Sequence, residues 1–214
     1  MKAIQLTNKT GMSDLYALVD DEFYPYLSQF RWHAKPGGYT TYVRRSEHSK
    51  KIYMHWDVGR LVGLELRDHI SRDGLDNRLA NLRPATHSQN MANRRKQKNN
   101  TSGFRGTIAA TNAPGKFDGR IKFHRRNLHL GRYSTAVEAG YAYNVAARLL
   151  FGEFADLNPI TVSVILNPLI SDPNQLSAVQ AGAIEASVTE RITKGILKNP
   201  DLCQQVLQDS LQMP

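Results

Sequence analysis

The chain has 214 residues, with 28 lysines and arginines against 19 aspartates and glutamates, which gives a formal net charge of +9. This length suits one large domain or two small ones, and the charge favours a polyanionic partner, nucleic acid before an acidic membrane surface. No stretch approaches the roughly 18 apolar residues of a membrane span, and a single cysteine, Cys203, excludes an internal disulfide and a structural zinc site of cysteine pairs. We therefore expect a nucleic-acid-binding protein of a reducing cytoplasm.

The N-terminal part of the chain predicts a small antiparallel sheet. Stretches rich in aromatic and β-branched residues indicate strands over 15–19, 31–34, 39–45 and 52–55, with a Pro-Gly-Gly turn at 36–38. A helix over 57–64 is expected to lead into the next strand. The packed face of the sheet is expected to consist of Trp32, Tyr39, Tyr42, Val43 and Tyr53.

The stretch over 66–98 is short, polar and dense in residues that bind metals or move protons. Asp68 and His69 end a predicted strand, and a turn-rich loop with Gly74 at its middle follows. A second short strand is expected over 81–86, and a helical pattern begins at His87. This strand–loop–strand–helix unit can bring Asn90 back towards the end of the first strand.

These side chains suit metal-assisted phosphodiester hydrolysis. Asp68 and the amide oxygen of Asn90 could supply two oxygen ligands to a hard divalent cation, Mg²⁺ or a substitute such as Mn²⁺. His69 is neutral for a good fraction of the time near pH 7, so it could take a proton from an attacking water. Asn81 could hold the second ring nitrogen of His69 and fix its tautomer.

Other polar residues nearby have simpler explanations. His33 and His55 could reach a metal or a phosphate, but a hydrogen-bonded structural role is the expectation for both. His87 is expected to cap the helix or to contact a phosphate. Turn formation explains Asp76 and Asn77, and an ion pair around Asp76 could fasten the loop.

The sequence DHISRDGLDNRLANLRPATHSQNMANR, over 68–94, resembles the HNH (His-Me finger) endonucleases of phages and mobile introns. The resemblance implies that Asp68 and Asn90 hold one divalent metal, that His69 is the general base and that Asn81 orients it. It also implies homing-type cleavage of DNA, in the cytoplasm of a bacterial or phage-infected cell. The scarcity of cysteine separates the chain from the zinc-stabilised branch of the family.

Two positions differ from the pattern of that family. Ser71-Arg72-Asp73 follows the Asp-His-Ile motif, where Asn-Gly-Asn is common, and Trp56 follows Met54-His55, where arginine is common. Neither change removes a residue with an implied catalytic role.

Basic residues dominate the segment over 94–132, in which Asp118 is the only acid. A solvated face usually mixes signs, so this asymmetry favours a surface that binds phosphates. The basic residues are Arg94, Arg95, Lys96, Lys98, Arg105, Lys116, Arg120, Lys122, Arg125, Arg126 and Arg132.

Alternation within the same region predicts three antiparallel strands, over 104–108, 117–123 and 127–133. Thr135 and Glu138 then fit a capping box at the start of a helix, and Gly152 is expected to end it. Small residues on this helix allow it to lie close to the strands. The sequence therefore predicts a three-stranded sheet backed by one helix.

The blocks SGFRGTIAA, GKFDGRIKF and LHLGRYSTAVEAGYAYNVAARLLFGEFADLN resemble the ethylene-response-factor (Apetala-type) DNA-binding domain over 102–158. The resemblance implies a sheet that enters the major groove, with contacts from Arg105, Lys116, Arg120, Lys122 and Arg132. The adjoining Arg94, Arg95 and Lys96 are also expected to bind DNA. Phe117 stands where tryptophan is usual, and Asp118 where a neutral or basic residue is common.

The tail over 160–214 predicts helices over 175–197 and 201–211. The first is expected to pack on the rest of the chain through an apolar stripe of Leu176, Val179, Ala183, Ala186, Ile192 and Ile196.

Together these patterns predict an α+β protein in three parts. These parts are an HNH nuclease domain over 1–98 with a ββα-metal motif at 66–98, a DNA-binding domain over 102–158 and a helical extension over 160–214. The expected function is metal-dependent cleavage of double-stranded DNA by a monomer. The alternatives are a non-catalytic, sequence-specific DNA-binding protein and a nuclease that acts on RNA.

Overall fold

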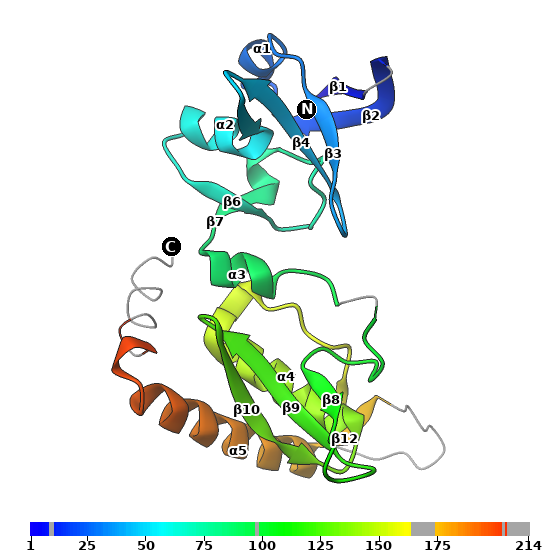
Figure 1. Ribbon diagram of the computed structural model, residues 1–214, viewed down its shortest axis with the longest axis vertical. Coiled ribbons are helices and arrows are strands. Elements are labelled where there is room, and N and C mark those ends of the chain that lie inside the picture. The colour runs from blue at the N-terminus through cyan, green and yellow to red at the C-terminus, as the bar shows by residue number, and fades with distance from the viewer. Residues whose placement is uncertain (9–10, 97–98, 164–173, 203, 205–214) are drawn as a thin grey trace. The chain divides into compact units, whose positions relative to one another are not determined.

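The computed structural model describes residues 1–8, 11–96, 99–163, 174–202 and 204. Its class is α+β, with several small sheets, and the chain divides into two compact units, Met1–Arg94 and Arg95–Pro214 (Figure 1). Among the described residues, every helix is too short or too polar to cross a membrane.

The first unit contains a five-stranded sheet in the order β2-β1-β3-β4-β5. Its strands are β1 (Lys2–Asn8), β2 (Gly11–Val19), β3 (His33–Pro36), β4 (Thr41–Glu47) and β5 (Lys50–Tyr53). All neighbours are antiparallel except β1 and β3, which run parallel. The strand β1 was not predicted. Helix α1 (Tyr24–Leu27) connects β2 to β3, and α2 (Met54–Leu61) follows β5 directly, so the prediction that α2 begins at residue 57 was wrong.

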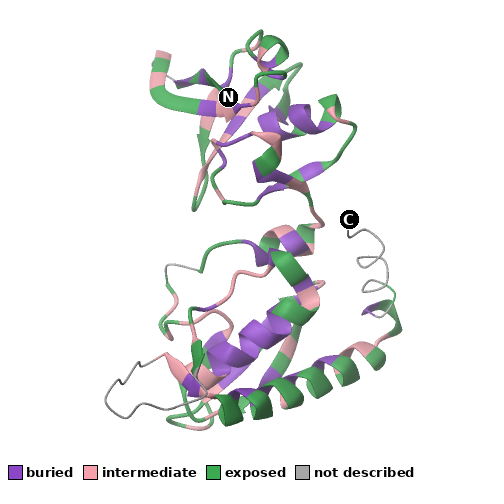
Figure 2. Cartoon of the chain, turned by 180° about the vertical axis from the view of Figure 1, so that it is seen from behind, coloured by how far each residue is buried: buried purple, intermediate pink, exposed green. Residues whose placement is uncertain are grey.

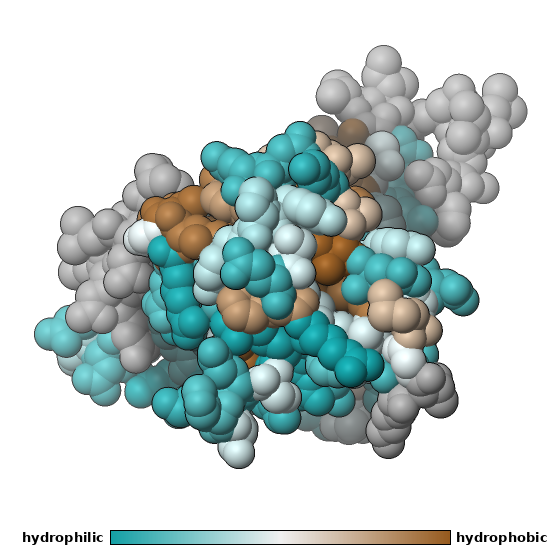
Figure 3. All heavy atoms as spheres, turned by 90° about the horizontal axis from the view of Figure 1, so that it is seen from above, coloured by the Kyte–Doolittle hydropathy of each residue, from teal (hydrophilic) through white to brown (hydrophobic). Residues whose placement is uncertain are grey.

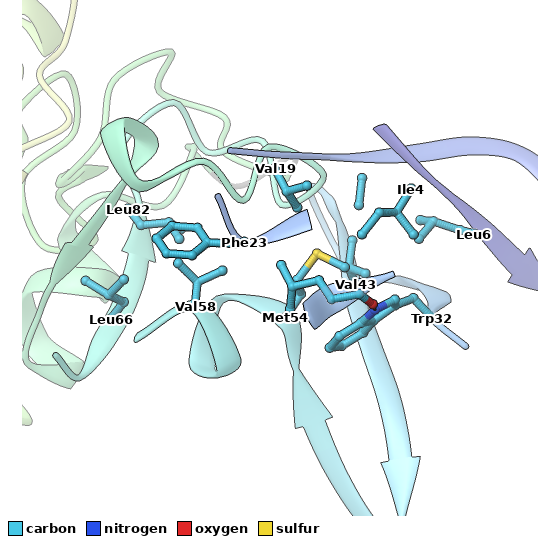
Figure 4. Packing of buried hydrophobic residues seen from close by; sticks show 12 residues of the cluster. Ile4, Leu6, Val19, Phe23, Trp32, Val43, Met54, Val58, Leu66 and Leu82 are labelled. Carbon is cyan, nitrogen blue, oxygen red and sulfur yellow. The ribbon is translucent and has the colours of Figure 1, made fainter. Parts of the chain in front are cut away.

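The apolar side chains of this unit pack between the sheet and α2. Trp32 is buried as predicted, and its ring Nε1 donates a 2.8 Å hydrogen bond to the carbonyl of Leu27. Met54 lies beside Val43 and Trp32, and Val58 lies beside Phe23 (Figure 4). Tyr39, in contrast, is exposed. On the face drawn in Figure 3 the surface is largely hydrophilic, with apolar side chains in small separate patches.

A strand pair follows α2 and extends the same core. β6 (Leu66–His69) pairs with β7 (Leu82–Pro84) in antiparallel register, through a loop that ends in the 3-10 helix η1 (Leu79–Asn81). Leu66 and Leu82 are buried in the cluster of the first unit, so the pair is fixed to it. α3 (His87–Ala92) follows, and a capping box between Thr86 and Gln89 starts it, which makes Thr86 the cap in place of His87.

The second unit contains the predicted sheet and helix. β8 (Thr107–Ala109), β9 (Phe117–Phe123) and β10 (Arg126–Tyr133) form an antiparallel sheet in the order β10-β9-β8. α4 (Ala136–Phe151) lies on one face of it, and its buried side (Figure 2) carries Ala139, Ala142 and Ala146. The capping box of Thr135 and Glu138 is confirmed, and Gly152 ends the helix with a φ of 53°. The first strand begins three residues later than predicted.

The tail continues the second unit. After the 3-10 helix η2 (Gly152–Phe154), β11 (Thr161–Ser163) pairs in parallel with β12 (Gln175–Ser177), and α5 (Ala178–Leu197) packs on α4 and β10. The predicted apolar stripe is confirmed only at Ile192 within the helix, because Leu176, although buried, belongs to β12, and Ala183 and Ala186 are exposed. Val179 is 84% exposed, and the buried positions are Ala181, Ile184, Val188 and Ile192. Most of the helix predicted over 201–211 lies outside the described residues.

Candidate active site

Asp68 and His69 lie next to each other at the end of β6, and both side chains are buried. The amide nitrogen Nδ2 of Asn93 is 3.0 Å from each carboxylate oxygen of Asp68 and 3.0 Å from the carbonyl of His69. Arg83, the neighbour of Asp68 across the strand pair, donates from Nε to Oδ2 at 2.9 Å. The carboxylate is therefore fixed by one amide and one guanidinium.

The hydrogen-bond partner of the His69 ring is Asn77, at 3.3 Å between Nε2 and Oδ1. The amide nitrogen of Asn77 donates to the carbonyls of Gly74 and Leu75, so its oxygen faces the ring. An imidazole that donates from Nε2 keeps Nδ1 as an acceptor. The loop thus holds His69 in the tautomer that can take a proton at Nδ1.

Aromatic rings enclose His69 on its other sides. His55 lies edge-to-face against it, with ring centroids 4.9 Å apart, and Tyr42 lies 5.9 Å away. Burial lowers the pKa of His69, while its bond to Asn77 and the charge of Asp68 act in the opposite direction. Burial, with a smaller effect of His69, lowers the pKa of His55 to about 3. Both rings are therefore neutral near pH 7.

The loop that carries Asn77 is tied to the sheet and to itself. The backbone N–H of Gly74 donates to Thr40 Oγ1 at 2.9 Å, and a Cβ at this position would lie 2.7 Å from the carbonyl of Thr41, so only glycine fits. Arg78 pairs with Asp76 at 2.6 Å and lowers the pKa of that carboxyl, which confirms the expected ion pair.

The other side chains predicted for the site make different contacts. Asn81 donates to the carbonyl of Asp76 and accepts from the N–H of Ser71, both at 2.8 Å, so its hydrogen bonds go to the loop backbone and not to His69. Asn90 donates from Nδ2 to the carbonyl of Arg67 at 2.8 Å. Its amide joins α3 to β6, next to the site.

Sequence reasoning missed Asn93 and Asn77. Asn93 follows Asn90 by three positions, a spacing that puts both side chains on one face of a helix, and this was the available signal. His33 is hydrogen-bonded to Thr7 at 2.7 Å, in keeping with the structural role expected for it. His55 makes ring contacts with Tyr53 and Trp56 besides His69.

The donor chemistry of the site fits a hard cation better than a soft one. Where the structure describes the chain, no three histidine, cysteine, aspartate or glutamate side chains gather into a metal-binding group. The oxygen donors are the carboxylate of Asp68 and the amide of Asn90. Asn93 turns its nitrogen to Asp68, and its oxygen accepts from Nε of Arg72 at 3.2 Å. A magnesium ion that keeps several waters needs only one or two protein ligands of this type.

The predicted DNA-binding residues of the second unit fall into two groups. On the sheet face opposite α4, Arg120 and Arg132 pair with the carboxylate of Asp118, while Lys122 is exposed. Arg105 has a side chain only 15% exposed, bonded to Asp156 at 2.7 Å and to the Tyr143 hydroxyl at 3.1 Å. Its guanidinium therefore supports the fold.

The remaining predicted cations are Lys116, which immediately precedes β9, and three residues at the boundary of the units in the sequence. Lys116 donates to the hydroxyl of Ser134 at 3.1 Å, and Lys96 donates to the carbonyl of Gly103. Arg94 contacts the sulfur of Met91, and Arg95 is exposed. All four can present charge to a polyanion.

No protein-family model matches the chain. The chain is 29% identical over 147 residues to a protein of Acanthamoeba polyphaga mimivirus that is named an uncharacterized HNH endonuclease. The match covers 68% of this chain and 75% of that relative. This distant similarity supports a relationship to HNH nucleases.

Proposed function

We propose that the chain is a metal-dependent endonuclease that hydrolyses phosphodiester bonds in double-stranded DNA. The observation that carries this proposal is the buried Asp68–His69 pair, in which a neutral imidazole adjoins a carboxylate held by Asn93 and Arg83. The similarity to a protein named an HNH endonuclease supports the same chemistry.

His69 is the general base of this proposal. Its Nδ1 accepts the proton of the attacking water, and Asn77 stabilises the resulting imidazolium through the bond at Nε2. Asn81 positions His69 indirectly, through Asn77, because its bond to the Asp76 carbonyl fixes the backbone next to Asn77. The aromatic walls around His69 restrict the ring to one orientation.

Asp68 would hold the divalent cation, Mg²⁺ or Mn²⁺, together with an amide oxygen. Asn90 is the proposed amide ligand, because its nitrogen bonds the Arg67 carbonyl, whereas Asn93 turns its nitrogen to Asp68 and its oxygen to Arg72. A bound cation of this type neutralises the scissile phosphate and stabilises the leaving oxygen. Arg83 and Asn93 fix the direction of the carboxylate through their hydrogen bonds.

The substrate is proposed from charge. The chain carries a formal +9, and its exposed cations include Arg94 and Arg95, at the boundary of the two units in the sequence, and Lys122 on the sheet of the second unit. Such cations bind phosphates without regard to sequence. A monomer with one active site of this kind nicks a duplex, and homing-type targeting requires the second unit to select the sequence.

The test is a supercoiled-plasmid assay with wild type, Asp68→Ala and His69→Ala, in Mg²⁺ and in EDTA. Asp14→Ala is the matched control, because Asp14 is an exposed carboxylate on β2. We expect nicking by wild type and Asp14→Ala in Mg²⁺ alone, and a loss of about 100- to 10,000-fold in His69→Ala. Equal cutting by His69→Ala would remove the proposed base. Salt-sensitive binding without cutting by wild type would favour a non-catalytic DNA-binding protein.

A further inference from the structure

The sheet face of the second unit contains one acid beneath two arginines and a histidine. The side chain of Asp118 is 5% exposed, while those of Arg120, His129 and Arg132 are 52%, 48% and 38% exposed. All four lie on the face opposite α4, because the alternate residues Ile121 and Phe123 are buried against the helix. The carboxylate is thus hidden, and its three partners face solvent.

Arg132 has the best-defined geometry of the three. It lies directly across from Asp118 in the β9–β10 register, and its Nε and Nη2 are 2.7 Å and 3.3 Å from the two carboxylate oxygens. This side-on pair uses one edge of the planar guanidinium. The Nη1–Nη2 edge, of which only Nη2 takes part in this pair, is the outer edge of the guanidinium.

Two other aspartate pairs of the chain have covered arginines. Arg45, which bonds Asp57 and lies over the ring of Phe30, has a side chain 7% exposed, and Arg105 beside Asp156 is similarly covered. Exposed arginines also bond Asp57 and Asp76, but each of these pairs lies within one helix or one loop. Arg132 instead reaches Asp118 across two strands of a sheet face, where an ion pair with an exposed guanidinium adds little to stability.

The charge of Asp118 also opposes phosphate binding. Arg132 holds the pKa of this carboxyl at about 2 against the effect of burial, so the group is ionised wherever the protein is folded. A single negative charge under a basic face weakens its attraction for a polyanion. It also fixes the direction of a flexible cation, which a purely phosphate-binding surface does not require.

We propose that Asp118 is a specificity-determining positioning residue that holds the outer edge of Arg132 for one guanine in the major groove. Arginine pairs in bidentate fashion with O6 and N7 of guanine, and a strand pair fits the major groove. Arg120 and His129 also contact the two carboxylate oxygens, which keeps the carboxylate in one position between them. This inference rests on the proposed binding of DNA by the sheet.

The test measures base preference and not affinity alone. Full-length wild type, in EDTA so that the DNA is not cut, selects duplexes from a random-sequence library, and the selected motif is then measured for Asp118→Asn and Arg132→Lys. Glu190→Gln is the matched control, since it removes the same charge from an exposed pair with Lys194 on α5. Thermal unfolding of each variant controls for the fold.

We expect wild type and Glu190→Gln to select the same motif, and both sheet variants to lose about 10- to 100-fold of the preference for guanine at one position. Replacing that guanine with 7-deazaguanine should weaken wild type and leave Asp118→Asn unaffected. An unchanged guanine preference in Asp118→Asn would overturn the inference and leave the proposed function standing. Wild type that binds DNA but selects no motif would overturn the inference and leave the cleavage chemistry standing, and wild type that binds no DNA would overturn both.

Discussion

Each unit contains an aspartate that faces an arginine across an antiparallel strand pair. Asp68 faces Arg83 between β6 and β7, and Asp118 faces Arg132 between β9 and β10. Arg83 is 12% exposed and works with a neutral amide, whereas Arg132 is 38% exposed and shares its carboxylate with Arg120 and His129. In the first pair the arginine supports the acid, and in the second we infer that the acid supports the arginine.

The largest expected difference between the two pairs is the loss of stability when each arginine is replaced by alanine. Arg83→Ala leaves a buried carboxylate without its cation, which we expect to lower the stability of the first unit by about 3 kcal/mol or more. Arg132→Ala leaves Asp118 with Arg120 and His129, and we expect a loss of about 1 kcal/mol at most.

The two units can be followed separately in urea titrations. Both tryptophans of the chain, Trp32 and Trp56, lie in the first unit, so their fluorescence reports its unfolding alone. The circular dichroism signal of α4 and α5 reports the second. Equal losses of stability in Arg83→Ala and Arg132→Ala would contradict the distinction between the pairs.

The stabilities of the two units should also respond to acid in different pH ranges. The pKa of His55 is about 3 in the folded chain, against an ordinary value of 6.5, and burial lowers the pKa of His69 too. Between those values the unfolded state binds more protons, so the first unit loses stability as pH falls below 6.5, by at most about 1.4 kcal/mol per pH unit for each ring.

The carboxyl of Asp118 responds in a lower range. Its pKa is about 2, against an ordinary 3.8, so its stabilising effect is complete above 3.8 and is lost as pH falls through about 2.

The loss of stability caused by the two histidines can be measured by tryptophan fluorescence in urea at about pH 7 and about pH 4.5. His55→Phe, the control, should flatten the dependence, and an unchanged slope in that variant would contradict the assignment.

Replacing Asn90 and Asn93 tests which amide supports Asp68 and which amide binds the cation. Asn93→Ala removes the bonds to Asp68 and to the His69 carbonyl, so we expect cleavage to fall by about 10- to 100-fold, with a loss of stability. Asn90→Ala removes one bond to the Arg67 carbonyl, so we expect little change in stability and a higher Mg²⁺ requirement. Mg²⁺ titrations of plasmid cleavage measure both, and an unchanged requirement in Asn90→Ala would exclude Asn90 as a ligand.

The smallest expected effects come from the helix caps. Thr86→Ala and Thr135→Ala each break a capping box, which we expect to cost about 1 kcal/mol in the unit concerned. Only Thr86→Ala should also slow cleavage, because α3 carries Asn90 and Asn93. Slower cleavage in both variants would indicate that the units do not act separately.

Local signals in the sequence were enough for much of the fold. The capping box of Thr135, the end of the helix at Gly152 and the strands β9 and β10 follow from short-range patterns, and the structure confirms them. The burial of Trp32 also followed from its sequence context. The phase of α5 did not, because it depends on Leu176 lying in a strand that pairs with β11.

The site shows the same limit at the level of single side chains. The sequence identified Asp68 and His69 as neighbours, since they are adjacent in the chain. It could not decide which of several asparagines bonds which group, because Asn77, Asn81, Asn90 and Asn93 reach the site through loop and helix-end geometry. Asp118 appeared as an exception within a basic segment, and only the strand register related it to Arg132.

The most direct test of the central claim is the single-turnover rate of plasmid cleavage in Mg²⁺ as a function of pH, for wild type and His69→Ala. If His69 is the general base, the wild-type rate is level near neutral pH and falls about tenfold per pH unit below the lowered pKa of that ring. His69→Ala is then slower throughout and lacks this fall. Equal rates and equal pH profiles for the two proteins would contradict the assignment of the base.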